Sequence, residues 1–142
     1  MVRRLTFLSD GQYAKLLTFR TGLRRFLRWS EQQAATVGLT PAQHQLLLAV
    51  RAHPDSRGPS VGELADYLCT RHHSVVQLID RTEQLGLIAR SREDSNDRRV
   101  VRLALTRAGR EKLALLTGIH LEEIRRLASL FGTFVEPAPA QQ

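Results

Sequence analysis

Apolar residues recur at helical spacing through the first quarter of the chain. The repeating positions are Leu16, Phe19, Leu23 and Phe26. A spacing of three and four residues places them on one face of an amphipathic helix. Ser9 and Gln12 stand at the positions of a capping box, and Gly38 is a typical residue just beyond a helix end. We therefore expect a long first helix over residues 9–37.

Two shorter helices are predicted next. Thr40, Pro41 and Gln43 supply a cap, a first-turn proline and a reciprocal glutamine, and the helix that they start should end before His53. The following stretch, HPDSRGP, is typical of a loop. Ser60 then caps a third helix. Its expected apolar face consists of Val61, Leu64, Ala65 and Leu68.

A fourth helix and a hairpin complete the central segment. The helix should run from residue 71 to about residue 85, where Gly86 stops it, with one apolar side. That side carries Val75, Leu78, Ile79, Thr82 and Leu85. Alternating apolar and polar residues then predict strands over 88–92 and 100–105, joined by the polar loop EDSNDRR.

The last helix is expected to begin after Thr106, which caps it, and to extend over residues 107–134. Its apolar face consists of Leu113, Leu116, His120, Ile124, Leu127 and Phe131. Residues 135–142 form a frayed tail. The element order α-α-α-α-β-β-α predicts a mainly α fold with a small β-hairpin, a winged helix-turn-helix, in a single domain over residues 1–142. Within it, residues 39–106 form the winged lobe.

Composition narrows the class of protein. The chain has 142 residues, of which 42% are apolar and 25% charged, as in globular proteins. It contains no apolar run of transmembrane length and no secretory leader pattern, so no membrane association is expected. One cysteine fits a reducing compartment. We therefore expect a cytoplasmic protein.

The net charge of +7 indicates a polyanionic partner, and double-stranded DNA is the expected one. The charge is unevenly placed. Residues 1–36 hold seven cationic residues against two acidic ones, whereas residues 59–107 hold eight against seven. The helix-turn-helix segment is therefore nearly neutral. Net charge therefore does not indicate that this segment binds DNA, and the prediction depends on where its arginines point.

The polar side of the fourth helix is unusual for a solvated face, because it carries His and Gln in place of Glu and Lys. His and Gln can exchange hydrogen bonds with base edges in the major groove, and the first turn can also address phosphates. We expect DNA contacts from Arg71, His72, His73, Ser74, Gln77 and Arg81. The alternative is an ordinary solvated helix face.

Arginines mark the predicted hairpin. Arg98 and Arg99 lie at its tip, where Asp97 could orient a guanidinium that enters a minor groove. Local ion pairing that only shapes the turn is the alternative, and both can hold. Arg90 and Arg92 share one face of the first strand and are expected to contact phosphates.

These residues together resemble the MarR (multiple antibiotic resistance regulator) family of winged helix-turn-helix proteins, over roughly residues 35–112. The matching pieces are Leu64-Ala65, Leu68, Val75, Ile79-Asp80-Arg81-Thr82-Glu83, Gly86-Leu87-Ile88, Asp97-Arg98-Arg99 and Leu105-Thr106-x-x-Gly109. The resemblance implies a homodimer with intertwined terminal helices, over 9–37 and 107–134, and a wing arginine in the minor groove. It also implies repression that a small anionic or phenolic effector relieves, bound between the dimer region and the DNA-binding lobe. Thr70 and Thr82 depart from the apolar residues usual in the family.

Arg20, Arg24 and Arg28 align on the first helix at intervals of four residues. They fit a solvated face, a long-range field that attracts DNA, or the wall of an anionic-ligand pocket.

Other chemistry has little support in the sequence. Cys69 stands in the turn between the third and fourth helices, where we expect it to be packed. The five histidines lack the spacing of a metal site, and His120 is expected to be a satisfied interface residue. No phosphate loop, nucleophile motif or carboxylate pair indicates catalysis. We therefore expect no enzyme activity, no cofactor and no metal.

The sequence thus predicts a sequence-specific regulator that binds a pseudo-palindromic operator as a homodimer, and acts as a ligand-responsive repressor. Two alternatives remain at this point: a sequence-tolerant architectural DNA binder, and a protein-interaction module on the same fold.

Overall fold

The computed structural model describes residues 7–92 and 100–131. Over these residues it confirms the predicted order of elements. They are α1 (Asp10–Thr36), α2 (Pro41–Ala52), α3 (Val61–Leu68), α4 (His72–Gln84), β1 (Ile88–Arg92), β2 (Val101–Leu105) and α5 (Arg107–Phe131). The predicted polar loop at 93–99 and the predicted tail at 135–142 lie outside the described residues.

The first three helices begin with the capping boxes that the sequence predicts. The hydroxyls of Ser9, Thr40 and Ser60 accept hydrogen bonds from the backbone N–H three residues later, at 3.3, 3.1 and 3.2 Å. Each side chain at that later position accepts a hydrogen bond from the cap's own N–H in return. Removing such a cap costs roughly 1 kcal/mol, so these local signals contribute to where each helix starts.

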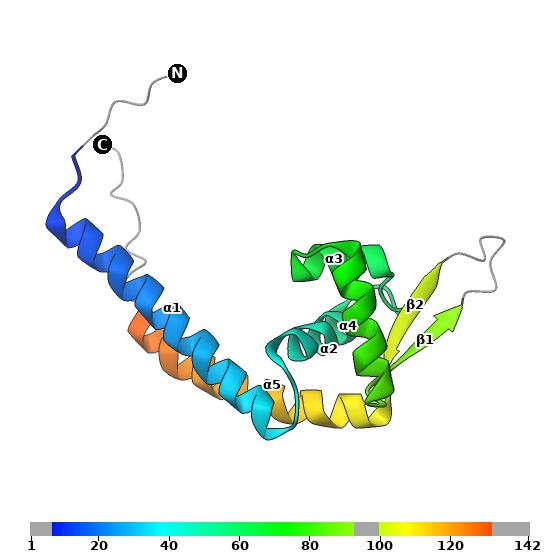
Figure 1. The fold of residues 1–142 in the computed structure, drawn as a ribbon. Helices are drawn as coiled ribbons and strands as arrows, with labels where there is room; N and C mark the ends of the chain where they lie inside the picture. Colours follow the sequence, from blue (N-terminus) through cyan, green and yellow to red (C-terminus); the bar gives the residue numbers. More distant parts are fainter. Residues whose placement is uncertain (1–6, 93–99, 132–142) are drawn as a thin grey trace, which may run out of the picture.

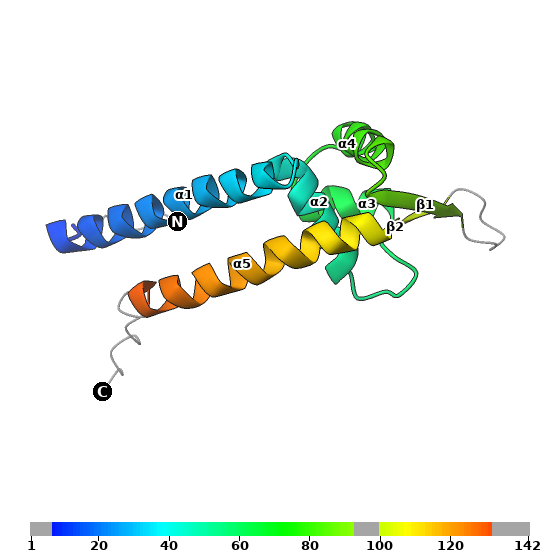
Figure 2. The same ribbon diagram turned by 90° about the horizontal axis from the view of Figure 1, so that it is seen from below.

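The molecule consists of a compact lobe and two long helices that project from it (Figure 1). The lobe contains α2, α3, α4 and the hairpin. Helices α1 and α5 run in opposite directions and lead away from the lobe, as the view from below also shows (Figure 2). Ser30 of α1 and His120 of α5 are joined by a 2.7 Å hydrogen bond between Oγ and Nε2.

The hydrophobic core lies inside the lobe, beneath α4. Leu46 and Leu47 of α2, Leu64 of α3, Ile79 of α4 and Leu103 of β2 are at most 2% exposed. Burying a side chain of this size stabilises the fold by about 1.5–3 kcal/mol, so this cluster holds α4 firmly with its opposite face outward.

The hairpin is fixed to the lobe at its base. Strands β1 and β2 pair antiparallel, with Ile88 opposite Leu105 and Arg90 opposite Leu103. The Thr106 hydroxyl donates to the Gly86 carbonyl at 2.6 Å, which ties the start of α5 to the turn after α4. The wing strands therefore start from a defined position relative to α4.

Two positions of α4 differ from expectation. Leu85, predicted on the apolar side, is 55% exposed because the helix ends at Gln84 and the chain turns away at Gly86, whose φ is +73°. Thr82 is fully buried, and its hydroxyl donates to the Leu78 carbonyl at 2.7 Å. This departure from the family pattern is therefore accommodated with its polar atom satisfied.

Much of the apolar surface of the long helices faces solvent in a single chain. On α1, Leu16, Leu17 and Leu27 are 57, 68 and 56% exposed, and on α5 Ile124 is 48% exposed. A contiguous exposed apolar face of this kind marks an interaction surface. No helix in the described part of the chain is both long enough and apolar enough to cross a membrane.

Candidate nucleic-acid interface

The outer face of α4 presents the polar residues that the sequence singled out. Val75, Ile79 and Thr82 are buried on the inner face, which turns the opposite face toward solvent. All six expected DNA contacts are exposed, namely Arg71, His72, His73, Ser74, Gln77 and Arg81. One helix of this width fits the major groove of B-DNA.

The first turn of α4 differs from those of α1, α2 and α3. Its N-cap is Arg71, in an extended conformation, and no side chain caps the helix. The backbone N–H groups of the first turn have no partner within an α-helix, and the helix dipole places partial positive charge there. With Arg71 beside it, this end of α4 suits a phosphate.

His73 and Gln77 form a hydrogen-bonded pair on the exposed face. The distance between Gln77 Nε2 and His73 Nε2 is 3.2 Å. An amide nitrogen can only donate, so Gln77 is the donor of this bond and His73 Nε2 the acceptor. The bond leaves Gln77 with its carbonyl oxygen and one N–H, the two groups that match the N6 and N7 edge of adenine.

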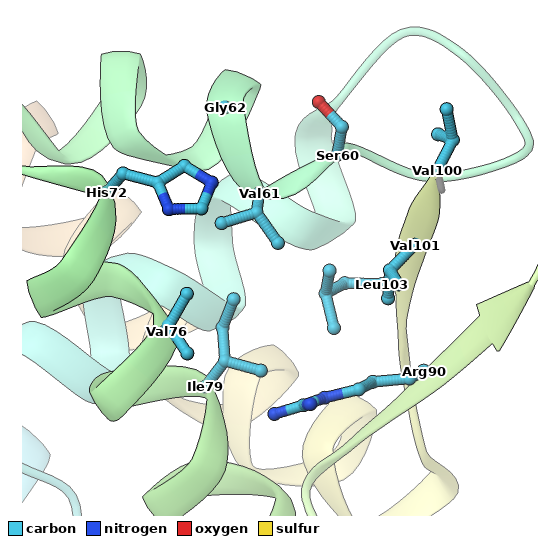
Figure 3. A pocket seen from close by; sticks show the side chains of 10 residues that line it. All are labelled: Ser60, Val61, Gly62, His72, Val76, Ile79, Arg90, Val100, Val101 and Leu103. Carbon is cyan, nitrogen blue, oxygen red and sulfur yellow. The ribbon is translucent and has the colours of Figure 1, made fainter. Parts of the chain in front are cut away.

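The first wing strand is linked to α4 by charge. Arg90 of β1 pairs with Asp80 through Nη2, and its Nε lies 3.4 Å from Glu83 Oε2. A cavity of about 410 Å³ separates α4 from the hairpin, and the Arg90 side chain reaches across it toward α4 (Figure 3). The phosphate contact predicted for Arg90 stays a prediction, since its guanidinium already serves two carboxylates.

The remaining wing residues can be placed only in part. Arg92 ends β1, and its side chain is not described. Arg98 and Arg99, the predicted minor-groove contacts, lie outside the described residues.

Cys69 corrects one expectation. It was expected to be packed in the turn, but it is exposed and adopts a left-handed conformation with φ of 50°. Its thiol is 3.7 Å from the Asp66 carbonyl. Cys69 closes the C-terminus of α3, a position where the backbone needs positive φ, and the side chain points out as a consequence.

A network near the wing base escaped the sequence analysis. His53 Nε2 lies 3.0 Å from Glu63 Oε2, and Arg102 Nη1 lies 3.6 Å from the other oxygen of Glu63. The pKa of Glu63 is lowered, and the largest cause is the hydrogen bond that its carboxylate accepts from the Ser60 backbone N–H. The capping-box spacing predicts the bond between Ser60 and Glu63. The charged partners of Glu63, His53 and Arg102, come from parts of the chain that are distant in sequence. Together they connect α2, α3 and β2.

A second cavity, of about 580 Å³, opens between α1, α2 and α5. Its lining includes Phe26, His44 and His120. Burial, and then the nearby His120, lower the pKa of His44. His120 Nδ1 is 2.7 Å from the Leu116 carbonyl and its Nε2 is bonded to Ser30, so both ring nitrogens have partners. The expectation of a satisfied histidine is confirmed.

The three arginines predicted to form an anionic-ligand pocket on α1 do not belong to this cavity. Arg20, Arg24 and Arg28 are all exposed, and none of them lines the cavity between α1, α2 and α5. Within one chain, the solvated-face and long-range-field interpretations fit this placement. Among the described residues, no three His, Cys, Asp or Glu side chains come together as a metal site.

The fold and the site together define a winged helix-turn-helix protein. Helices α3 and α4 form the helix-turn-helix, α4 presents its exposed polar face, and β1 and β2 form the wing beside it.

Comparison with known proteins adds the family. The model of the MarR family matches residues 37–100. The HTH-type transcriptional repressor MdtR of Bacillus subtilis (strain 168) is 33% identical over 102 residues, which are 72% of this chain and 61% of MdtR. The chain thus spans about three fifths of the length of that curated relative.

Solved structures agree on the fold. A MarR family protein from Bacillus stearothermophilus superposes with a TM-score of 0.70 at 23% identity, over 92% of this chain and 86% of the other. MepR of S. aureus, in its complex with DNA, superposes with a TM-score of 0.67 at 22% identity, over 79% and 78% of the two chains. The chain belongs to the MarR family.

Proposed function

We propose that this protein is a transcription regulator that binds a pseudo-palindromic DNA site as a homodimer and acts as a repressor. The observation that carries the proposal is the outer face of α4, which exposes six polar residues and begins at a helix start that no side chain caps. The relative MdtR is a repressor, and the similar protein MepR has been solved bound to DNA. Repression by this chain and its operator are our proposals.

Dimerisation would bury the exposed apolar faces of α1 and α5. Leu16, Leu17 and Ile124 are each about half exposed or more, and burying such side chains against a second copy is favourable. A two-fold dimer presents two α4 helices about one turn of DNA apart, which explains why the site would be a pseudo-palindrome. Sedimentation should give twice the mass of the chain at micromolar concentration.

The proposal is tested by selecting bound sequences from a random DNA pool with the full chain. The expected result is an inverted repeat whose half-sites are centred about 10 base pairs apart. The site should bind at least ~10³-fold more tightly than bulk DNA. Gln77→Ala should relax the preference at one position per half-site, at a cost of about 1–3 kcal/mol.

Other results would identify the alternatives. A pool that stays random although DNA is bound would indicate a sequence-tolerant architectural protein. No DNA binding even at low salt would indicate a protein-interaction module. Wild-type selectivity in Gln77→Ala would remove α4 as the reading element.

Ligand response is a second part of the proposal. The cavity between α1, α2 and α5 has about 580 Å³, which is the size of a small-molecule site, and it lies where the long helices join the lobe. An occupant there would change the angle between the two parts of the chain and with it the spacing of the two α4 helices. With that spacing changed, the protein would release the DNA.

A further inference from the structure

His73 and Gln77 lie one above the other on the exposed face of α4, and their side chains are joined. The two residues are four positions apart, the spacing at which side chains on a helix meet. The Gln77 amide nitrogen donates to His73 Nε2 over 3.2 Å. Within the described part of the chain, this is the one side-chain hydrogen bond of Gln77. The ring of His73 therefore determines which way round the Gln77 amide lies.

The helix beneath this pair is fixed by the core. Val75 and Ile79 are 0 and 2% exposed, and each stands two residues beyond a member of the pair. Asp80 follows Gln77 by three residues, near enough on the helix surface for its carboxylate to attract the amide N–H. That carboxylate already belongs to the ion pair with β1. The acceptor that holds the amide is therefore His73.

The orientation of the amide decides what Gln77 offers to a base. After its bond to His73, the amide has its oxygen and one N–H left. Adenine presents the N6 amino donor and the N7 acceptor side by side in the major groove, so both remaining amide groups find a partner. Guanine presents two acceptors, O6 and N7, so the amide oxygen would face an acceptor. The reversed amide would offer N–H groups alone, which match guanine.

We propose that His73 is the positioning residue that makes Gln77 read adenine, and that the hydrogen-bonding polarity at position 73 selects the base. The inference rests on the proposed function, in which α4 reads a DNA site, and it names the base and the residue that selects it. Glutamine loses considerable side-chain entropy when it is fixed, so an amide already held loses less on binding DNA than a free one. His73 reduces this loss for one orientation of the amide only.

The experiment starts from the DNA site that the full chain selects from a random pool. The base pair at which Gln77→Ala loses discrimination is the pair that Gln77 reads, and in the wild-type site it should be adenine with thymine. Fluorescence anisotropy then gives the affinities for two duplexes that differ only there, with adenine or guanine. His73→Ala should lower the ratio of the two affinities by about 2–10-fold, as expected for the loss of one hydrogen bond.

Two further variants reverse or keep the polarity at position 73. His73→Glu keeps an acceptor beside the amide and should retain the adenine preference, although its charge lowers the affinity for both duplexes. His73→Lys offers donors alone, which turns the Gln77 oxygen toward it, so the preference should shift to guanine. In a Gln77→Ala background neither variant should change the ratio, because the amide that they orient is gone.

Gln84 supplies the matched control for charge. It is exposed on the same helix, seven residues beyond Gln77 and about 10 Å from it along the axis. Gln84→Glu and Gln84→Lys introduce the same charges as the variants at position 73. They should change the affinity for both duplexes together and leave the ratio as it is in the wild type. Thermal unfolding checks that each variant folds.

Several results would overturn the inference and leave the proposed regulator in place. They are another base at the pair that Gln77 reads, an unchanged ratio in His73→Ala or His73→Lys, a lost preference in His73→Glu, a shift that persists without Gln77, and an equal shift in the Gln84 variants. An unchanged ratio with a lower unfolding temperature in His73→Ala would show that the pair only stabilises the helix. A pool that stays random overturns the proposed regulator, and the inference falls with it.

Discussion

Asp80 of α4 and Arg90 of β1 form an ion pair that links the candidate reading helix to the wing. Glu83, one turn of α4 away from Asp80, shares the same guanidinium. The two carboxylates would otherwise repel the phosphates of a bound DNA. Arg90 thus offsets part of the negative charge on α4.

The first prediction concerns this pair. Arg90→Gln should lower affinity for all DNA sequences, because it leaves Asp80 and Glu83 uncompensated. Adding Asp80→Asn should restore part of the loss, by no more than about fivefold, as expected for an exposed pair worth about 0.2–1 kcal/mol. A double-mutant cycle in DNA affinity measures the coupling. Strictly additive effects would show that Arg90 acts on the phosphates alone.

The second prediction concerns the wing arginines. Replacing Arg98 and Arg99 together by Ala should weaken binding to specific and random DNA alike. If both neutralise phosphates, the slope of log K against log salt should become shallower by about 1.8. Fluorescence anisotropy at several salt concentrations gives the slope. Arg107→Ala serves as the control, and the wing assignment fails if its slope changes as much.

The third prediction uses two glycines of α5. A Cβ at Gly109 would lie 2.1 Å from the Leu87 carbonyl oxygen, whereas a Cβ at Gly118 would meet nothing within 4 Å. Gly109→Ala should therefore destabilise the fold by about 1–3 kcal/mol through overpacking. Gly118→Ala should stabilise it by about 0.5–1 kcal/mol, since glycine is a poor helix residue.

Urea unfolding measures both changes, and it is done at one fixed protein concentration because the stability of the proposed dimer would depend on concentration. Equal effects of the two substitutions would mean that α5 does not approach Leu87 as closely as the structure has it.

The elements were predictable because their signals are local. Ser60 and Glu63 mark a helix start through atoms three residues apart, and Gly86 marks a stop through its own backbone. The exposed side of α4 followed from helical periodicity alone. Such features need no knowledge of where other segments lie.

What the sequence did not predict depends on contacts between distant segments. Arg90 can pair with Asp80 only because the chain turns at Gly86, and His53 pairs with Glu63 across the loop between α2 and α3. Cys69 was expected to be packed because free cysteines are often buried, but it is exposed at the end of α3, where its backbone has a positive φ. The cavity between α1, α2 and α5 depends on packing of three helices, which no local pattern describes.

The last prediction follows from His44, whose pKa is lowered from its ordinary value of 6.5 by burial and then by the neighbouring His120. The unfolded chain therefore takes up a proton at this residue at higher pH than the folded chain does. The stability contributed by neutral His44 is fully present above pH 6.5 and is lost as the pH falls through the lowered pKa of the folded state. Glu31 lines the same cavity as His44 and His120. One such group changes the unfolding free energy by at most about 1.4 kcal/mol per pH unit.

Urea unfolding between neutral and mildly acidic pH should show this decline in the wild type and a shallower one in His44→Gln. His72→Gln, at an exposed histidine of α4, should retain the wild-type slope. An unchanged slope in His44→Gln would mean that this imidazole is as accessible to protons in the folded chain as in the unfolded one.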